Sequence, residues 1–210
     1  MAHPLHIAVL ASATWALAVL TASWLQARAY GKRLLFARAA GDRTAGIRYA
    51  FSTSMLPQAK ESVMMHLPSY LAGIAFHLGT FAAFGLLAVS VVSINLPVSA
   101  RWLACVVTLA GAIGGLALLA KRIATPHLRG LSAPDDFVAN VLTTTFVALA
   151  GATVLVAALR NVWLVAASLL LFYLPIGKIR HCLFFFSTRA HLGAFFGYRG
   201  VLPPSRSQEP

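Results

Sequence analysis

The chain consists of long runs of apolar residues separated by shorter polar segments. These runs approach or exceed the ~20 residues that an α-helix needs to cross the ~30 Å hydrocarbon layer of a membrane. Within that layer the backbone must satisfy its own hydrogen bonds, which favours helices. The pattern therefore predicts an all-α membrane protein, a bundle of five transmembrane helices over residues 5–25, 69–92, 102–120, 137–159 and 162–186.

Proline and capping residues mark where these helices begin and bend. Pro68 suits the first turn of the second span, and Ser132-Ala-Pro-Asp135 is typical of a helix start just before the fourth. Pro175 lies inside the fifth apolar run, so we expect a kink there, roughly two turns before His181. Residues 1–202 are interpreted as one domain, and residues 203–210 as a flexible, proline-rich tail.

The connections between the spans differ in length and charge. Short connections at Pro97–Arg101 and Arg160–Asn161 predict two antiparallel hairpins. All but two of the 17 Lys and Arg residues fall in segments toward one membrane face, and the two exceptions, Arg101 and Arg160, fall toward the other face. This positive-inside bias predicts an N-terminus outside and a C-terminus in the cytoplasm. The net charge of +12 therefore indicates topology rather than a nucleic-acid partner.

Composition agrees with a membrane protein and excludes some redox centres. The chain is 59% hydrophobic, above the roughly 45–50% of soluble domains. Its two cysteines, Cys105 and Cys182, are too few for an iron–sulfur cluster, and the absence of a C-x-x-C-H motif excludes covalent c-type haem. The basic segment Gly31–Ala50 either lies in the membrane interface, docks a partner protein, or forms a solvated loop.

Two histidines, His77 and His181, lie inside apolar runs, where an ionisable side chain is costly and indicates function. Each falls about 12 Å from the cytoplasmic end of its predicted span at ~1.5 Å per residue. This common depth favours two axial ligands of one haem iron. Gly73 and Gly177, four residues earlier, would share their faces and leave room for a flat ring. Alternatively, each histidine hydrogen-bonds a backbone carbonyl and the glycines serve helix packing.

A second pair, His66 and His191, would lie at the cytoplasmic interface. On a continuous helix His66 is about 20° around from His77, and His191 is roughly 80° from His181. They could ligate a second haem or contact a quinone headgroup, the haem propionates or a partner. The propionates could pair with cations that are equally explained as membrane anchors: Lys60, Arg122, Lys178, Arg180 and Arg189.

Two motifs carry a family resemblance. Phe76-His77-Leu78-Gly79 and Pro175-Ile176-Gly177-Lys178-Ile179-Arg180-His181 resemble the Phe-His-x-Gly and Pro-x-x-Lys/Arg-x-x-His motifs of the gamma-subunit family of respiratory nitrate reductase. That family includes the membrane cytochromes b of heterodisulfide reductase and of sulfite-reduction complexes, and its five-span topology covers nearly the whole chain. The resemblance implies that His77 and His181 hold the cytoplasm-proximal haem b.

The chain departs from the family at the second haem. The outer haem uses histidines in regions where this chain has Leu87 and Trp163. One haem b is therefore expected, and a second only if His66 and His191 bind it on the inner side. With an inner haem alone, quinone would react near the cytoplasmic face.

The resemblance implies a haem b subunit of a respiratory complex in a bacterial or archaeal cytoplasmic membrane. It would transfer electrons between the quinone pool and a cytoplasmic iron–sulfur subunit. No catalytic residue is assigned, because the catalytic centre is expected on another subunit. Two alternatives stay open: a cofactor-free membrane anchor and a small proton-relaying transporter. The absence of Asp and Glu from the predicted spans, and of an inverted repeat, argues against the transporter.

Overall fold

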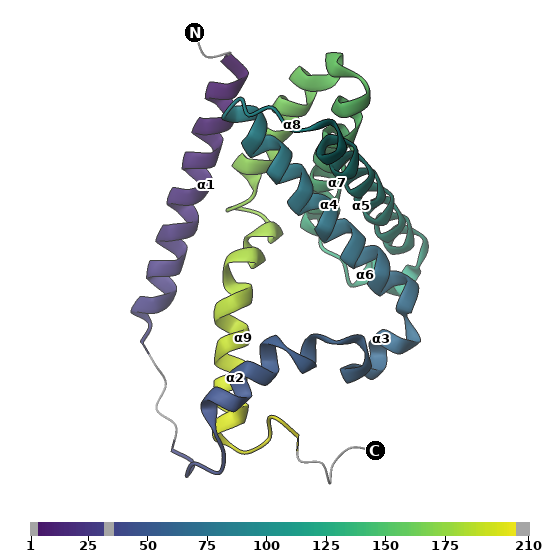
Figure 1. Ribbon diagram of the computed structural model, residues 1–210. Coiled ribbons are helices and arrows are strands. Elements are labelled where there is room, and N and C mark those ends of the chain that lie inside the picture. Colours follow the sequence, from purple (N-terminus) through teal and green to yellow (C-terminus); the bar gives the residue numbers. More distant parts are fainter. Residues whose placement is uncertain (1–3, 32–35, 205–210) are drawn as a thin grey trace. The chain divides into compact units, whose positions relative to one another are not determined.

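All regular elements of the described chain are helices. The computed structural model describes residues 4–31 and 36–204, so residues 205–210 of the expected tail lie outside the described residues. In chain order, the α-helices are α1 Pro4–Ala29, α2 Arg43–Phe51, α3 Glu61–Met65, α4 Leu67–Val91, α5 Val98–Ala124, α6 Pro126–Gly130, α7 Pro134–Leu155, α8 Arg160–Tyr173 and α9 His181–Tyr198 (Figure 1). Four 3-10 helices join them: η1 Thr53–Met55, η2 Pro57–Ala59, η3 Ala157–Leu159 and η4 Lys178–Arg180.

Four helices of the described chain, α1, α4, α5 and α7, are long and apolar enough to cross a membrane. A fifth span exists if the interrupted pair Ala157–Tyr173 and Lys178–Tyr198 counts as one. The prediction of an all-helical protein is therefore confirmed, and four to five helices rather than five are long and apolar enough to cross a membrane. The prediction of one kinked helix over 162–186 is wrong, because α8 ends at Tyr173 and the next α-helix begins at His181. Pro175 breaks the apolar run instead of only kinking it.

The helices belong to two compact units, each described here by itself. The first contains the described residues of Met1–Val19 together with Leu67–Ile179, and the second those of Leu20–His66 together with Arg180–Pro210. In the first unit α4 packs on α5 and α7 packs on α8, which confirms both predicted hairpins. The second connection lies slightly earlier than expected, because α7 ends at Leu155 and α8 begins at Arg160.

Small residues let α4 and α5 approach closely. A Cβ added to Gly79 would lie 2.7 Å from the Cα of Gly111, and one added to Gly114 would lie 2.6 Å from the carbonyl oxygen of Ala72. Both distances are shorter than side chains tolerate, so these positions require glycine. Such contacts are typical of membrane helices, where small residues bring backbones into van der Waals contact. We call the facing positions Gly79, Gly111 and Gly114 the α4–α5 seam.

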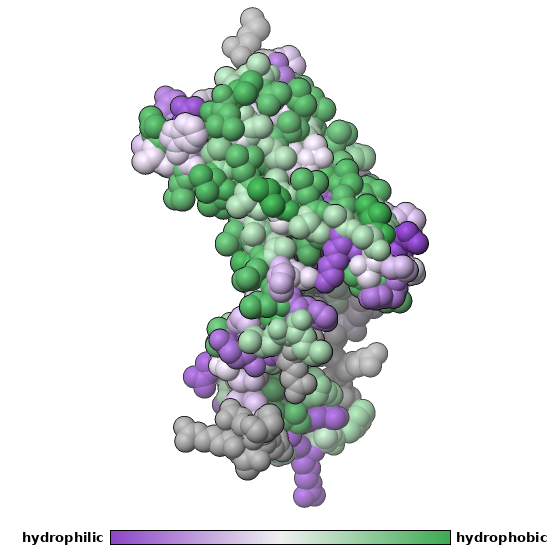
Figure 2. All heavy atoms as spheres, turned by 90° about the vertical axis from the view of Figure 1, so that its right-hand side faces the viewer, coloured by the Kyte–Doolittle hydropathy of each residue, from purple (hydrophilic) through white to green (hydrophobic). Residues whose placement is uncertain are grey.

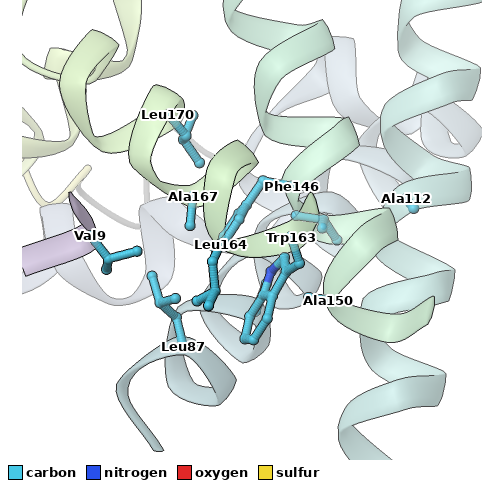
Figure 3. Packing of buried hydrophobic residues seen from close by; sticks show 11 residues of the cluster. Val9, Leu87, Ala112, Phe146, Ala150, Trp163, Leu164, Ala167 and Leu170 are labelled. Atoms are coloured by element: carbon cyan, nitrogen blue, oxygen red, sulfur yellow. The ribbon is translucent and has the colours of Figure 1, made fainter. Parts of the chain in front are cut away.

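The core of the first unit lies where α8 crosses α4 and α7 (Figure 3). The rings of Phe146 and Trp163 stack with centroids 6.2 Å apart, and Phe84 packs 4.9 Å from Phe146. Leu164 and Leu170 of α8 are almost fully buried in the same cluster, and Val9 adds α1 to it. In the family that the motifs resemble, the region of Trp163 provides a haem ligand. In this chain Trp163 is a core residue.

Outside this core, large apolar side chains remain exposed on the outer faces of the long helices. Examples on α4 and α5 are Leu71, Leu78, Phe81, Leu103 and Ile113. Figure 2 shows hydrophobic side chains gathered in broad patches on the molecular surface. Soluble monomers rarely expose contiguous apolar surface on this scale, so a lipid environment explains it.

The second unit is built around α2 and α9, which lie side by side (Figure 1). A Cβ on Gly193 would meet the carbonyl oxygen of Gly46 at 2.7 Å, and one on Gly197 would meet that of Asp42 at 2.5 Å. Asp42 also caps α2 by accepting a hydrogen bond from the Thr44 backbone N–H at 2.7 Å. The segment Gly31–Ala50, of which residues 32–35 lie outside the described residues, therefore contains a helix packed on α9.

The α4–α5 seam leads to a test of stability. We expect Gly79→Leu to lower the unfolding temperature of the detergent-solubilised protein, because overpacking a close contact costs about 1–3 kcal/mol. Gly85→Leu is the matched control on the same helix, since no atom lies within 4 Å of a Cβ at Gly85. Equal unfolding temperatures for the two variants would contradict the seam.

Candidate functional site

His77 lies on α4 with an exposed ring and a defined hydrogen bond. Its Nδ1 lies 2.7 Å from the carbonyl oxygen of Gly73, one turn earlier. A carbonyl only accepts hydrogen bonds, so Nδ1 carries the proton and Nε2 keeps its lone pair in the neutral ring. Metal-bound histidines commonly have this arrangement, in which one nitrogen donates to a carbonyl and the other is left for the metal.

Gly73 differs from the glycines of the α4–α5 seam. No described atom lies within 4 Å of a Cβ built on it, whereas Gly79 on the same helix is in contact with α5. Helix packing therefore explains Gly79 but does not explain Gly73. The space over Gly73 and the ring of His77 lie on one face of α4, as the four-residue spacing predicts.

His181 is the first residue of α9 and is exposed. The residues before it are not α-helical, so Gly177 does not sit one turn below His181 as expected. A Cβ on Gly177 would instead collide with the ring of Tyr173. The prediction that Gly177 clears a face for His181 is wrong, because Pro175 ends the helix. His77 and His181 belong to different units, so their pairing stays a prediction.

The structure separates His66 from the helix that carries His77. His66 is the C-terminal cap of α3 with φ −127° and ψ 36°, and α4 begins at Leu67. The expectation that His66 shares a face with His77 on a continuous helix is therefore wrong. His191 does lie on the same helix as His181, as expected. A second haem at His66 and His191 stays a prediction.

Of the five cations expected near the propionates, Arg122, Lys178 and Arg189 bind a carboxylate or a carbonyl of the protein. Arg122 Nη1 lies 3.5 Å from Asp136 Oδ2, and Lys178 makes an ion pair with the other oxygen of that carboxylate. Arg189 donates from Nε to the Ala50 carbonyl at 2.5 Å. Arg180 is exposed and Lys60 is half-buried at the start of α3.

Asp136, which the sequence analysis did not single out, joins three segments of the first unit. It is buried at the start of α7 and accepts a hydrogen bond from the Ala133 backbone N–H at 3.0 Å. Ala133 is the N-cap, so α7 begins within the segment that the sequence predicted as a helix start. Ser132 accepts a hydrogen bond from Arg122 at 2.9 Å. Through Arg122 and Lys178, Asp136 connects the end of α5 to the segment after α8. The acidic pair after Pro134 was the signal that could have identified it.

Trp15 of α1 satisfies a carbonyl that the break releases. Pro175 has no N–H for the carbonyl of Leu171, and the Ile176 N–H donates to Tyr173 at 3.1 Å instead of to Phe172. The indole Nε1 of Trp15 donates to the Phe172 carbonyl at 3.1 Å. The rings of Trp15 and Phe172 also stack, with centroids 5.6 Å apart. The break is therefore stabilised by α1.

In the described part of the chain, no cluster of three or more His, Cys, Asp or Glu side chains is placed to hold a metal ion. A haem iron needs only two protein ligands, so this observation bears on other metal centres alone. Comparison with protein-family models, with curated proteins and with solved structures finds no match to this chain. Its function must therefore be inferred from its own residues.

The Asp136 network is testable with two cations. We expect Lys178→Gln to destabilise the protein by roughly 1 kcal/mol, a modest value because the Lys178 side chain is 57% exposed. Arg129→Gln removes the same charge from an exposed residue of α6 and should leave the unfolding temperature unchanged. Thermal unfolding in detergent measures both, and a larger loss in Arg129→Gln would contradict the network.

The contact between Trp15 and the break is tested by Trp15→Phe. The variant keeps an aromatic ring beside Phe172 but loses the indole donor, so we expect a loss of about 1 kcal/mol. Trp102→Phe serves as the control, because Trp102 is exposed on α5. The same unfolding temperature in both variants would show that the Phe172 carbonyl does not need its donor.

Proposed function

We propose that this chain is a haem b membrane subunit of a respiratory complex. It would transfer electrons between the quinone pool and a cytoplasmic iron–sulfur partner subunit. The observation that carries this proposal is His77, whose Nδ1 is bound to the Gly73 carbonyl and whose Nε2 is left as a ligand. The space over Gly73 lies on the face of α4 that carries His77 and would leave room for a flat group beside the His77 ring.

The donor set suits a b-type haem. His77 would provide one axial ligand and His181, at the start of α9, the other. Bound haem supplies one-electron redox chemistry, and the protein sets its potential through the ligands, burial and nearby charge. The hydrogen bond from His77 to Gly73 would orient the imidazole and raise its basicity as a ligand. The motif resemblance to the nitrate reductase gamma-subunit family supports the same pair.

Arg180 is the better candidate for binding a propionate. Arg122, Lys178 and Arg189 are already paired with protein groups, and breaking those pairs would cost part of the affinity. Arg180 is exposed and directly precedes His181 in the chain. We therefore assign Arg180 to the anionic edge of the haem.

The partner and the quinone follow from charge and topology. Exposed arginines of the second unit, Arg38, Arg43, Arg48 and Arg199, support the docking of an acidic cytoplasmic surface such as that of an iron–sulfur subunit. Quinone would exchange electrons with the haem near the same membrane face. The catalytic centre of the complex would lie on the partner side.

A cofactor-free membrane anchor is the second candidate. The hydrogen bond between His77 and Gly73 also favours it, because that bond satisfies one ring nitrogen within α4. A proton-relaying transporter has less support. Interrupted helices in transporters offer freed carbonyls to ions, but the Phe172 carbonyl at this break is already bound by Trp15.

The test is a dithionite-reduced minus oxidised absorption spectrum with haem quantified per purified chain. We expect one haem b in the wild type and its loss in both His77→Ala and His181→Ala. His66→Ala and His191→Ala should keep the haem if only one is bound.

His127→Ala is the matched control, because His127 is an exposed histidine of α6. It should retain the wild-type spectrum. A folded wild type without haem would refute the cytochrome and leave the anchor. Two haems in the wild type, with one lost in His66→Ala or His191→Ala, would establish the inner second pair.

A further inference from the structure

A cavity of about 370 Å³ opens in the first unit where α4 ends, α5 begins, α7 ends and α8 begins. One part of its lining is apolar, including Leu86 and Val154, and another part is polar, including Ser90, Asn95 and Thr153. Arg101 and Arg160 line the same cavity. The lining therefore suits an amphiphilic ligand with a polar head.

The two arginines differ in how they are held. Arg160 donates from Nη2 to the Ser90 hydroxyl at 3.1 Å and lies 3.3 Å from Nε2 of His6. In the part of the chain that the structure describes, the guanidinium of Arg101 makes no hydrogen bond or ion pair. The cavity thus holds one guanidinium fixed by Ser90 and His6 and one that is available to a ligand.

No carboxylate of the chain neutralises these arginines within the described residues. The lining contains neither Asp nor Glu. Asp135 and Asp136 lie at the start of α7, whereas the cavity lies at its end. Two helix starts and two helix ends meet at the cavity, so their dipoles largely offset one another and the arginines decide the local potential.

The position of the arginines along the sequence is also unusual. Arg101 and Arg160 are the two Lys or Arg residues that the charge pattern places on the membrane face otherwise without cations. Both line the same cavity, although they are 59 residues apart in the chain. Topology does not require them there, which favours an anionic ligand shared by the two arginines.

Trp163 adds a buried hydrogen-bond donor to the cavity wall. Its side chain is 3% exposed and lines the cavity, and its Nε1 has no partner among the described residues. Leaving a buried donor without an acceptor is costly, so such a donor commonly binds a water or a ligand.

We propose that this cavity binds the phosphate of an anionic phospholipid headgroup, such as phosphatidylglycerol. The guanidinium groups of Arg101 and Arg160 would hold the phosphate oxygens, because planar guanidinium matches phosphate in bidentate geometry. Ser90 and Asn95 would bind the headgroup hydroxyls, and the apolar wall would contact the glycerol and the start of the acyl chains. This site is independent of the proposed haem.

The experiment measures lipid binding to the detergent-purified full chain by native mass spectrometry, with thermal unfolding in parallel. Phosphatidylglycerol should bind and raise the unfolding temperature, while phosphatidylcholine should do so less. Arg101→Gln should weaken the apparent affinity for phosphatidylglycerol about tenfold, the effect of losing one charge-assisted hydrogen bond. Arg101→Lys keeps the positive charge but lacks the planar guanidinium. Its affinity for phosphatidylglycerol should lie between those of the wild type and Arg101→Gln.

Arg129→Gln is the matched control, because Arg129 is an exposed arginine on α6, away from the cavity. It should bind phosphatidylglycerol like the wild type. Inorganic phosphate at equal ionic strength distinguishes the source of the anion. A stabilisation by phosphate alone that Arg101→Gln abolishes would support an anion site filled from solution. Equal binding by the wild type, Arg101→Gln and Arg160→Gln would overturn the proposal.

Discussion

An interruption in an apolar segment releases backbone groups that a membrane cannot hydrate, and this constraint organises the first unit. Pro175 ends α8, and Trp15 of α1 supplies the donor that the Phe172 carbonyl has lost. The segment that follows is held by Lys178, which pairs with the buried carboxylate of Asp136. The contacts of Trp15 in α1 and of Asp136 in α7 thus both lie at the break that Pro175 produces.

The glycines show how one residue type serves different ends. Gly79 brings α4 against α5, where any side chain would collide with backbone. At Gly73, two turns earlier on the same helix, no described atom lies within 4 Å of an added Cβ, and its carbonyl orients His77. Gly177 lies in the break beneath the ring of Tyr173. Gly73 and Gly177 each lie four residues before a histidine, so sequence spacing does not distinguish them. Only their surroundings in the structure do.

The charged residues divide in a similar way. Arg122, Lys178 and Arg189 complete the structure by binding a carboxylate or a carbonyl, and such contacts reduce their capacity to bind a ligand. Within the described residues the Arg101 guanidinium has no such contact, and it lines a cavity whose lining contains no acidic residue. Binding of an anionic group is therefore expected at Arg101 and Arg180 rather than at the cations that already bind groups of the protein.

The sequence by itself determined the helical class, four of the spans, the two hairpins and the face of α4 that carries Gly73 and His77. These follow from apolar run length, connection length and helical periodicity, which are local properties. Only the tertiary structure decided that the fifth run breaks, that α4 begins after His66, and that Asp136 collects two cations. Each of these depends on contacts between residues far apart in sequence, or on whether a helix survives a proline or a polar residue. That outcome is set by the partners available in the fold and not by the local pattern.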